Sequence, residues 1–411
     1  MTRARLAALW GGFLIAHAIA IALGWLWPNQ PMGDTYLVYE PWSLAAIMGG
    51  DVMGVSAAWV YPPLALAPMV LAQTLVWFSS YSLAWAVMVT VLDLVAFWVL
   101  VGRGRSTSRV IAGGFWAVFI AVLGPIGIFR LDAVTVPIAV VGLLLALRHP
   151  RIAGMLVGAA TWMKVWPAAL VAALVIALRG RWRVVAGGAL VSVVIAGVVV
   201  LAGGANHVLG FITTQGDRGL QIEAVAATPF LFGAGGAQIY YDREILTYQV
   251  AGAGVEQTAQ LLSPLMAIVV AGICAIGVWR VRAGSTVRAV LPPLALALVV
   301  ALIVCNKVGS PQFQTWLIAP LVLWLVWDRA HAMGPSVLAL AAAALTHLVY
   351  PIYYHHVLAS DTVAVTVLGV RNALVVALGV WAVVLLWRTP IHEGNSRARR
   401  LLRRPVGNER I

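Results

Sequence analysis

The sequence predicts an all-α protein, a polytopic bundle of transmembrane helices with about twelve crossings. The first observation is composition: 62% of the 411 residues are hydrophobic and 10% are charged, whereas soluble proteins are roughly 45–50% apolar. The second is a mean hydropathy of +0.94. The third is that most of the 27 Lys and Arg residues fall in short breaks on alternate sides of a row of apolar segments. A soluble globular protein is therefore excluded.

If twelve of the apolar segments cross the membrane, every basic break falls on the same, cytoplasmic side. They run from 6–27, 81–102, 110–129, 133–147, 152–163, 165–178, 184–203, 259–281, 289–305, 315–327, 335–350 and 363–387. Several are shorter than the roughly 17–25 residues of a full span. Because the short segments 152–163 and 165–178 meet at Lys164, we expect a cavity that enters from the outer face.

Two further segments precede the second crossing. Residues 63–78 are apolar, but counting them as a span would place Arg103, Arg105 and Arg109 outside, against the positive-inside rule. We therefore predict that 63–78 form a re-entrant or interfacial segment. Residues 36–48, in the long first outer loop, are predicted to form a short amphipathic helix in the outer interface.

The same rule orients the chain. The basic breaks are predicted to be cytoplasmic, with both termini on that side of a plasma membrane, and polar outer segments at 28–62, 204–258, 306–314 and 351–362. Residues 1–387 are interpreted as one integral membrane catalytic domain and 388–411 as a basic cytoplasmic tail. The net charge of +13 is dispersed over separate turns, which favours anionic lipid headgroups over nucleic acid as the partner.

Asp34 is the first candidate for chemistry on the outer face. It follows the first span after a short link containing Pro28 and Pro31, at the membrane surface where a lipid-linked headgroup would lie. A carboxylate there can act as general base toward a hydroxyl, although a helix-capping Asp is the alternative. Tyr36, Tyr39 and Tyr61 are candidate substrate-binding residues in the same loop, and Tyr61 can stack on a sugar or serve structure alone.

Arg130 and Asp132 lie at the outer junction of two spans. They can form a mutual salt bridge that closes the turn, or they can bind substrate, and the sequence leaves both readings open. The other candidate substrate-binding residues are polar side chains of later outer segments: Gln221, Glu223, Gln312 and Gln314.

Four cations can surround one anion. Lys164 and Arg371 lie near or within apolar runs, where ionisable groups are expensive and usually functional, and Arg218 and Lys307 lie in outer segments. Charge-assisted hydrogen bonds from such a set suit the phosphate of a donor. Snorkelling of Lys164 and Arg371 to the interface is the alternative.

Other ionisable groups lie inside the spans. Asp93, His17 and His347 could form a proton pathway, but each is isolated in the sequence and such groups are more often satisfied by neighbouring helices. The adjacent His355 and His356 are a weak metal signal. No metal site, cofactor or nucleotide-binding motif is predicted.

Several short motifs together carry a resemblance to a known family. The GDTY segment at 33–36 with Tyr39, the YPP segment at 61–63, the turn at 164–167 and the KVGSPQ segment at 307–312 resemble the membrane-embedded glycosyltransferases of superfamily C. Within them, the chain is most similar to the actinobacterial polyprenyl-phosphate-mannose-dependent α-mannosyltransferases. Members often carry histidines after the SerPro at 310–311, where this chain has Gln312, Phe313 and Gln314.

The resemblance implies an enzyme that moves a sugar, mannose in the first place, from a polyprenyl-phosphate donor to a glycolipid or lipoglycan acceptor, with inversion and with Asp34 as general base. A transporter or flippase of a lipid-linked or anionic substrate is the alternative from another class, since intramembrane ionisable residues suit alternating access. A second alternative keeps the lipid-phosphate donor and changes the sugar to arabinofuranose or glucose.

Overall fold

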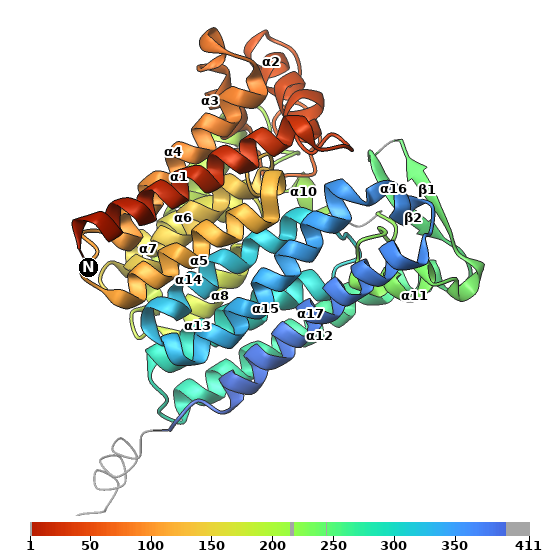
Figure 1. The fold of residues 1–411 in the computed structure, drawn as a ribbon. Coiled ribbons are helices and arrows are strands. Elements are labelled where there is room, and N and C mark those ends of the chain that lie inside the picture. Colours follow the sequence, from red (N-terminus) through yellow and green to blue (C-terminus); the bar gives the residue numbers. More distant parts are fainter. Residues whose placement is uncertain (1, 214–217, 244, 392–411) are drawn as a thin grey trace, which may run out of the picture.

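The protein is a bundle of long helices whose loops and short elements gather mainly at one end (Figure 1). The computed structural model describes residues 2–213, 218–243 and 245–391. Within these ranges the chain is helical apart from one two-stranded sheet and the connecting turns. The predicted all-α fold class is confirmed.

Eight helices of the described chain are long and apolar enough to cross a membrane. Every one of the twelve predicted crossings contains a helix, and the other four helices have only 10 to 14 residues. At 1.5 Å per residue these are shorter than the roughly 30 Å of hydrocarbon that a full span needs. The long helices are α1 (Arg3–Leu26), α4 (Tyr81–Val101), α5 (Thr107–Leu123), α9 (Arg181–Leu201), α12 (Val255–Arg282), α13 (Val287–Val304), α15 (Arg329–His347) and α17 (Thr362–Trp387). The short ones are α6 (Asp132–Leu145), α7 (Pro150–Met163), α8 (Ala168–Ala177) and α14 (Ile318–Trp327).

Small residues let some of the helices approach closely. A Cβ at Gly154 of α7 would collide with the backbone of Val184 in α9, and a Cβ at Gly187 of α9 would collide with the backbone of Arg151. Such backbone contacts are the usual way in which membrane helices pack, because lipid provides no hydrophobic drive between them. Helices α13 and α14 lie in the interior of the bundle and bury most of their side chains.

The two ends of the bundle differ. Figure 1 places the N-terminus and the end of α17 at one end, and α2, α3, α16 and the sheet at the other, which we call the loop end. Of the predicted tail at 388–411, residues 392–411 lie outside the described residues.

The first loop forms two short helical elements at the loop end. The predicted interfacial helix is present as a π-helical turn, Asp34–Tyr39, that continues into α2 (Glu40–Ile47). The predicted re-entrant segment is a broken helix, with the α-helical part α3 (Leu66–Gln73) between 3₁₀ turns at Pro63–Ala65 and Val76–Phe78. Its eight-residue α-helix packs on α2.

The remaining short elements complete the loop end. Helices α10 (Gly210–Thr213), α11 (Thr228–Leu231) and α16 (Tyr354–Leu358) each have four or five residues. Strands β1 (Gln238–Asp242) and β2 (Thr247–Ala251) pair antiparallel, with Tyr241 opposite Tyr248. This hairpin was not predicted from the sequence.

Candidate functional site

Asp34 and Arg130 form an ion pair at the loop end. Asp34 begins the π-helical turn after α1, and its Oδ2 lies 3.3 Å from Nε of Arg130, two residues before the start of α6. The Asp34 side chain is 35% exposed, whereas that of Arg130 is 6% exposed. The carboxylate is thus open to a substrate on one side and held by a buried cation on the other.

Arg130 is fixed in place by backbone oxygens. Its Nη1 donates to the carbonyls of Pro31, at 2.8 Å, and Phe129, at 3.0 Å, and Nη2 lies 3.5 Å from the Tyr350 hydroxyl. Burial alone would lower the pKa of Arg130, but Asp34, Tyr350 and Tyr39 together outweigh it and the pKa is raised. The planar guanidinium can meet all of these partners at once, which a lysine could not.

Tyr39 links this pair to the start of α6. Its hydroxyl donates to Asp34 Oδ2 at 3.4 Å and accepts the backbone N–H of Leu131 at 3.1 Å. The ring is 1% exposed, and burial raises its pKa well above the usual value. Tyr39 therefore stays a neutral phenol that donates a hydrogen bond to Asp34 from the buried side.

A second ion pair joins Asp132 to Lys164. Asp132 is the first residue of α6, and its Oδ2 lies 3.0 Å from Nζ of Lys164, where α7 ends in extended backbone before α8. Its other oxygen accepts a 2.6 Å hydrogen bond from Nε1 of Trp316. The indole of Trp316 stacks on that of Trp166, with ring centroids 5.7 Å apart. Asp132 is fully buried by these contacts, whereas the Lys164 side chain keeps 12% exposure.

Tyr61 lies between the two ion pairs. Nζ of Lys164 lies 4.7 Å from the centroid of its ring, and the charges of Asp34 and Asp132 also act on its hydroxyl. Burial raises the pKa of Tyr61, against the opposing effect of Lys164. For Lys164, burial would lower the pKa, but Asp132 and Tyr61 reverse the direction and the pKa is raised. The two pairs and this tyrosine therefore form one charged centre.

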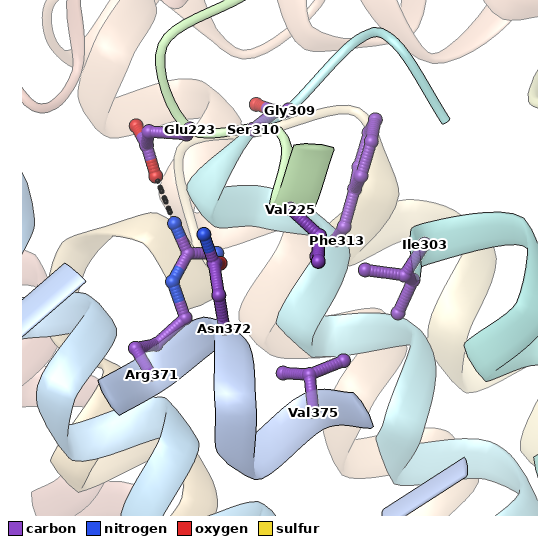
Figure 2. A pocket seen from close by; sticks show the side chains of 9 residues that line it. All are labelled: Glu223, Val225, Ile303, Gly309, Ser310, Phe313, Arg371, Asn372 and Val375. Carbon is purple, nitrogen blue, oxygen red and sulfur yellow. Dashed lines mark hydrogen bonds and ion pairs between the residues drawn. The ribbon is translucent and has the colours of Figure 1, made fainter. Parts of the chain in front are cut away.

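Glu223 and Arg371 form a third ion pair, beside the charged centre. Figure 2 shows Arg371 and Asn372 projecting from α17 into a small pocket, with Glu223 reaching in from the segment before α11. Nη2 of Arg371 lies 2.9 Å from Glu223 Oε2, and both side chains are 3% exposed. Asn372 donates to the Thr228 hydroxyl at 2.8 Å. Gly309, Ser310 and Phe313 also line the pocket.

The remaining candidates lie around these pairs. Arg218 is half-buried, and its Nε has no hydrogen-bond partner among the described residues. The backbone N–H of Gln221 donates to the carbonyl of Lys307 at 3.0 Å. Gln312 and Gln314 are buried in the 3₁₀ turn at Pro311–Leu317, and Tyr36 is half-buried.

The structure brings together Asp34, Tyr39, Tyr61, Arg130, Asp132 and Lys164. One interpretation of the sequence was a mutual salt bridge between Arg130 and Asp132. In the structure Arg130 pairs with Asp34 and Asp132 pairs with Lys164. The four predicted phosphate ligands are less alike than expected, because Lys164 and Arg371 each neutralise a carboxylate of their own.

Sequence reasoning missed several partners of these residues. Trp316 meets Asp132 across 184 positions, and Arg371 meets Glu223 across 148, so neither contact leaves a local pattern. The common signal was weak: ionisable residues at the loop-end termini of apolar segments. Inside the bundle, Nε2 of His17 lies 2.9 Å from Oδ2 of Asp93, so these two groups pair with each other. Oδ1 of Asp93 is buried without a hydrogen-bond partner among the described residues.

The fold and the charged centre define a multi-pass membrane protein with a polar, partly open site at one end of the bundle. Residues 59–311 match the sequence model of glycosyltransferase family 87, and the chain belongs to this family. It is accordingly a membrane glycosyltransferase. Comparison with curated proteins gave no match. Tyr61, Arg130, Asp132 and Lys164 lie inside the matched region, and Asp34 precedes it.

Proposed function

We propose that the enzyme transfers a sugar, mannose in the first place, from a polyprenyl-phosphate donor to a glycolipid or lipoglycan acceptor on the outer face of the plasma membrane. The observation that carries the proposal is the charged centre, in which a partly exposed carboxylate lies beside buried and half-buried cations. It lies at the end of the bundle opposite the N-terminus (Figure 1). A positive-inside orientation puts that end outside the cell and both termini in the cytoplasm.

Asp34 is the proposed general base. It takes the proton of an acceptor hydroxyl as the oxygen attacks the anomeric carbon, and the bond from that carbon to the phosphate oxygen breaks. The electron pair leaves with polyprenyl phosphate, and the configuration at the anomeric carbon inverts. Arg130 does not touch the substrate in this scheme; it holds Asp34 in its reacting position, 3.3 Å away.

Lys164 and Arg218 are the proposed ligands of the donor phosphate. Lys164 faces Tyr61 and keeps part of its side chain exposed, and Arg218 has an Nε–H with no partner among the described residues. Fixed cations in a site with little water stabilise the charge of a departing phosphate without reorganising. Lys307 belongs to the same outer surface through its contact with Gln221. Arg371 acts by holding Glu223 in place.

The remaining parts of the chain have supporting roles in this proposal. Residues 1–387 form the catalytic domain, and 388–411 form a basic tail that contacts anionic lipid on the cytoplasmic face. The prenyl chain lies in the bilayer against the bundle and enters through a lateral opening.

The test is a transfer assay with purified full-length protein in lipid nanodiscs. Radiolabelled polyprenyl-phosphate mannose, glucose and arabinofuranose are offered separately with an extract of glycolipids as acceptor. We expect transfer from the mannose donor and an α-linked product by NMR. Transfer from none of the three donors, or transfer from a nucleotide sugar in their place, would overturn the proposal.

A further inference from the structure

A row of tyrosine rings connects the exposed hairpin with the charged centre. Tyr241 of β1 is 44% exposed, and its ring lies opposite that of Tyr248 in β2, with centroids 4.8 Å apart. Tyr248 contacts Tyr354 at the start of α16, at 5.9 Å, and Tyr354 contacts Tyr350, at 4.9 Å. We call these four residues the tyrosine row.

The tyrosine row ends at the proposed base. The guanidinium of Arg130 lies 6.0 Å from the centroid of Tyr350, and the Tyr350 hydroxyl is 3.5 Å from Nη2 of the same arginine. Arg130 in turn holds Asp34. A chain of ring contacts thus runs from a solvent-exposed hairpin to the carboxylate, and Tyr248, Tyr350 and Tyr354 are half-buried along it.

An unused hydrogen-bond donor lies beside this row. Gln221 pairs with Gln249, the neighbour of Tyr248 in β2, through an antiparallel bridge, and its side chain is 96% buried. Nε2 of Gln221 has no hydrogen-bond partner among the described residues. A buried donor without a partner costs free energy, so such atoms are expected to meet a ligand or water.

This combination suits an oligosaccharide. The apolar C–H faces of sugar rings pack on aromatic rings, and their hydroxyls bond to amide donors and to tyrosine hydroxyls. A lipid chain would need no such donors, and a lone phosphate would need no row of rings.

We propose that the tyrosine row is an extended binding track for the saccharide portion of the acceptor. Its far end, at Tyr241, contacts sugar units remote from the reacting hydroxyl, and its near end, at Tyr350, delivers the terminal unit to Asp34. This inference rests on the proposed function and deepens it, because it makes an oligosaccharide, and not a short glycolipid, the preferred acceptor.

The first experiment measures binding and needs no activity. Full-length protein in nanodiscs is titrated with soluble α-mannotetraose, α-glucotetraose and α-arabinofuranotetraose, and saturation-transfer NMR gives an apparent affinity for each. We expect at least one tetrasaccharide to bind, and Tyr241→Ala to weaken it by roughly threefold to tenfold, the worth of one aromatic contact. Tyr241→Phe keeps the ring and should retain the affinity.

The matched control is Tyr353→Ala. Tyr353 is 48% exposed at the same end of the molecule, but its ring contacts only His356 among the rings of the described residues. Binding of no tetrasaccharide by the wild type, or an equal loss of affinity in Tyr241→Ala and Tyr353→Ala, would overturn the track.

The second experiment separates the track from the reaction. With an active donor, Tyr241→Ala should raise KM for a tetrasaccharide-bearing lipid acceptor and leave KM for its monosaccharide counterpart and for the donor unchanged. If Tyr241→Ala left KM for the tetrasaccharide acceptor unchanged, or changed KM equally for both acceptors, the track would be refuted while the proposed transfer stayed intact. If the wild type uses no donor, the proposed function fails, and the binding titration still decides on the track.

Discussion

The ion pair between Glu223 and Arg371 gives the sharpest prediction of stability. The pair lies in the pocket of Figure 2, with 2.9 Å between Nη2 and Oε2 and with 3% exposure of each side chain. Glu223→Gln is nearly isosteric and removes only the negative charge. The guanidinium of Arg371 is then left buried beside Asn372, Val375 and Phe313, without a counter-charge.

The expected cost follows from burial. Removing one partner of a buried ion pair destabilises a protein by about 3–5 kcal/mol, because the remaining charge is no longer compensated. For a chain of this size, such a loss lowers the apparent melting temperature by on the order of 5–10 °C. The double variant Glu223→Gln, Arg371→Met removes both charges and should recover most of the loss, since a neutral pocket carries no desolvation penalty.

The assay is thermal unfolding of purified protein in one detergent at one heating rate, followed by loss of monodisperse protein on size exclusion. Glu256→Gln in the first turn of α12 is the matched control, since this glutamate is exposed and accepts a hydrogen bond from the neighbouring Gln260. A melting temperature of Glu223→Gln equal to that of Glu256→Gln would refute the reasoning, and so would a double variant less stable than the single one.

Three other expectations concern the charged centre. Arg130→Met should lower kcat by roughly 10²–10³ and change acceptor KM little, because Asp34 loses the group that positions it. A change in KM alone for Arg130→Met would contradict this role. Because the pKa of Lys164 is raised in the folded protein, its ion pair contributes its full stability below the ordinary lysine pKa and loses it only as pH rises through the higher folded value. The difference in melting temperature between wild type and Lys164→Met should therefore stay constant from pH 6 to pH 9 and shrink only in strongly alkaline solution. A difference that already shrinks between pH 7 and pH 9 would contradict this expectation. Trp316→Phe removes the 2.6 Å hydrogen bond that the indole N–H donates to the buried Asp132 carboxylate. It should lower the free energy of unfolding, measured by denaturant titration, by about 1.5–3 kcal/mol. An unchanged unfolding midpoint would disprove this expectation.

The helices were predictable because each is encoded by a continuous apolar segment. The basic breaks marked where they end, and the shortness of α7 and α8 around Lys164 was visible in the sequence. The family resemblance also gave the class of enzyme, which the match to glycosyltransferase family 87 confirms.

The partners of the site residues were not predictable in the same way. Asp34 was expected among cations of later outer segments, but its nearest cation is Arg130, before α6. Such a contact depends on how α1, α5 and α6 pack, and no local pattern encodes that packing. The hairpin was hidden for another reason: its strands are five residues each and contain Ile, Tyr and Val at strand-like density, but they lie in a glycine-rich segment that reads as loop.

The most direct measurement of the account is sugar transfer by Asp34→Asn. The variant keeps the shape of the side chain and removes the group that accepts the proton, so the rate of transfer from polyprenyl-phosphate mannose should fall by roughly 10²–10⁴ at an unchanged melting temperature. Transfer by correctly folded Asp34→Asn at close to the wild-type rate would contradict the assignment of Asp34 as the base, and with it the mechanism proposed for the charged centre.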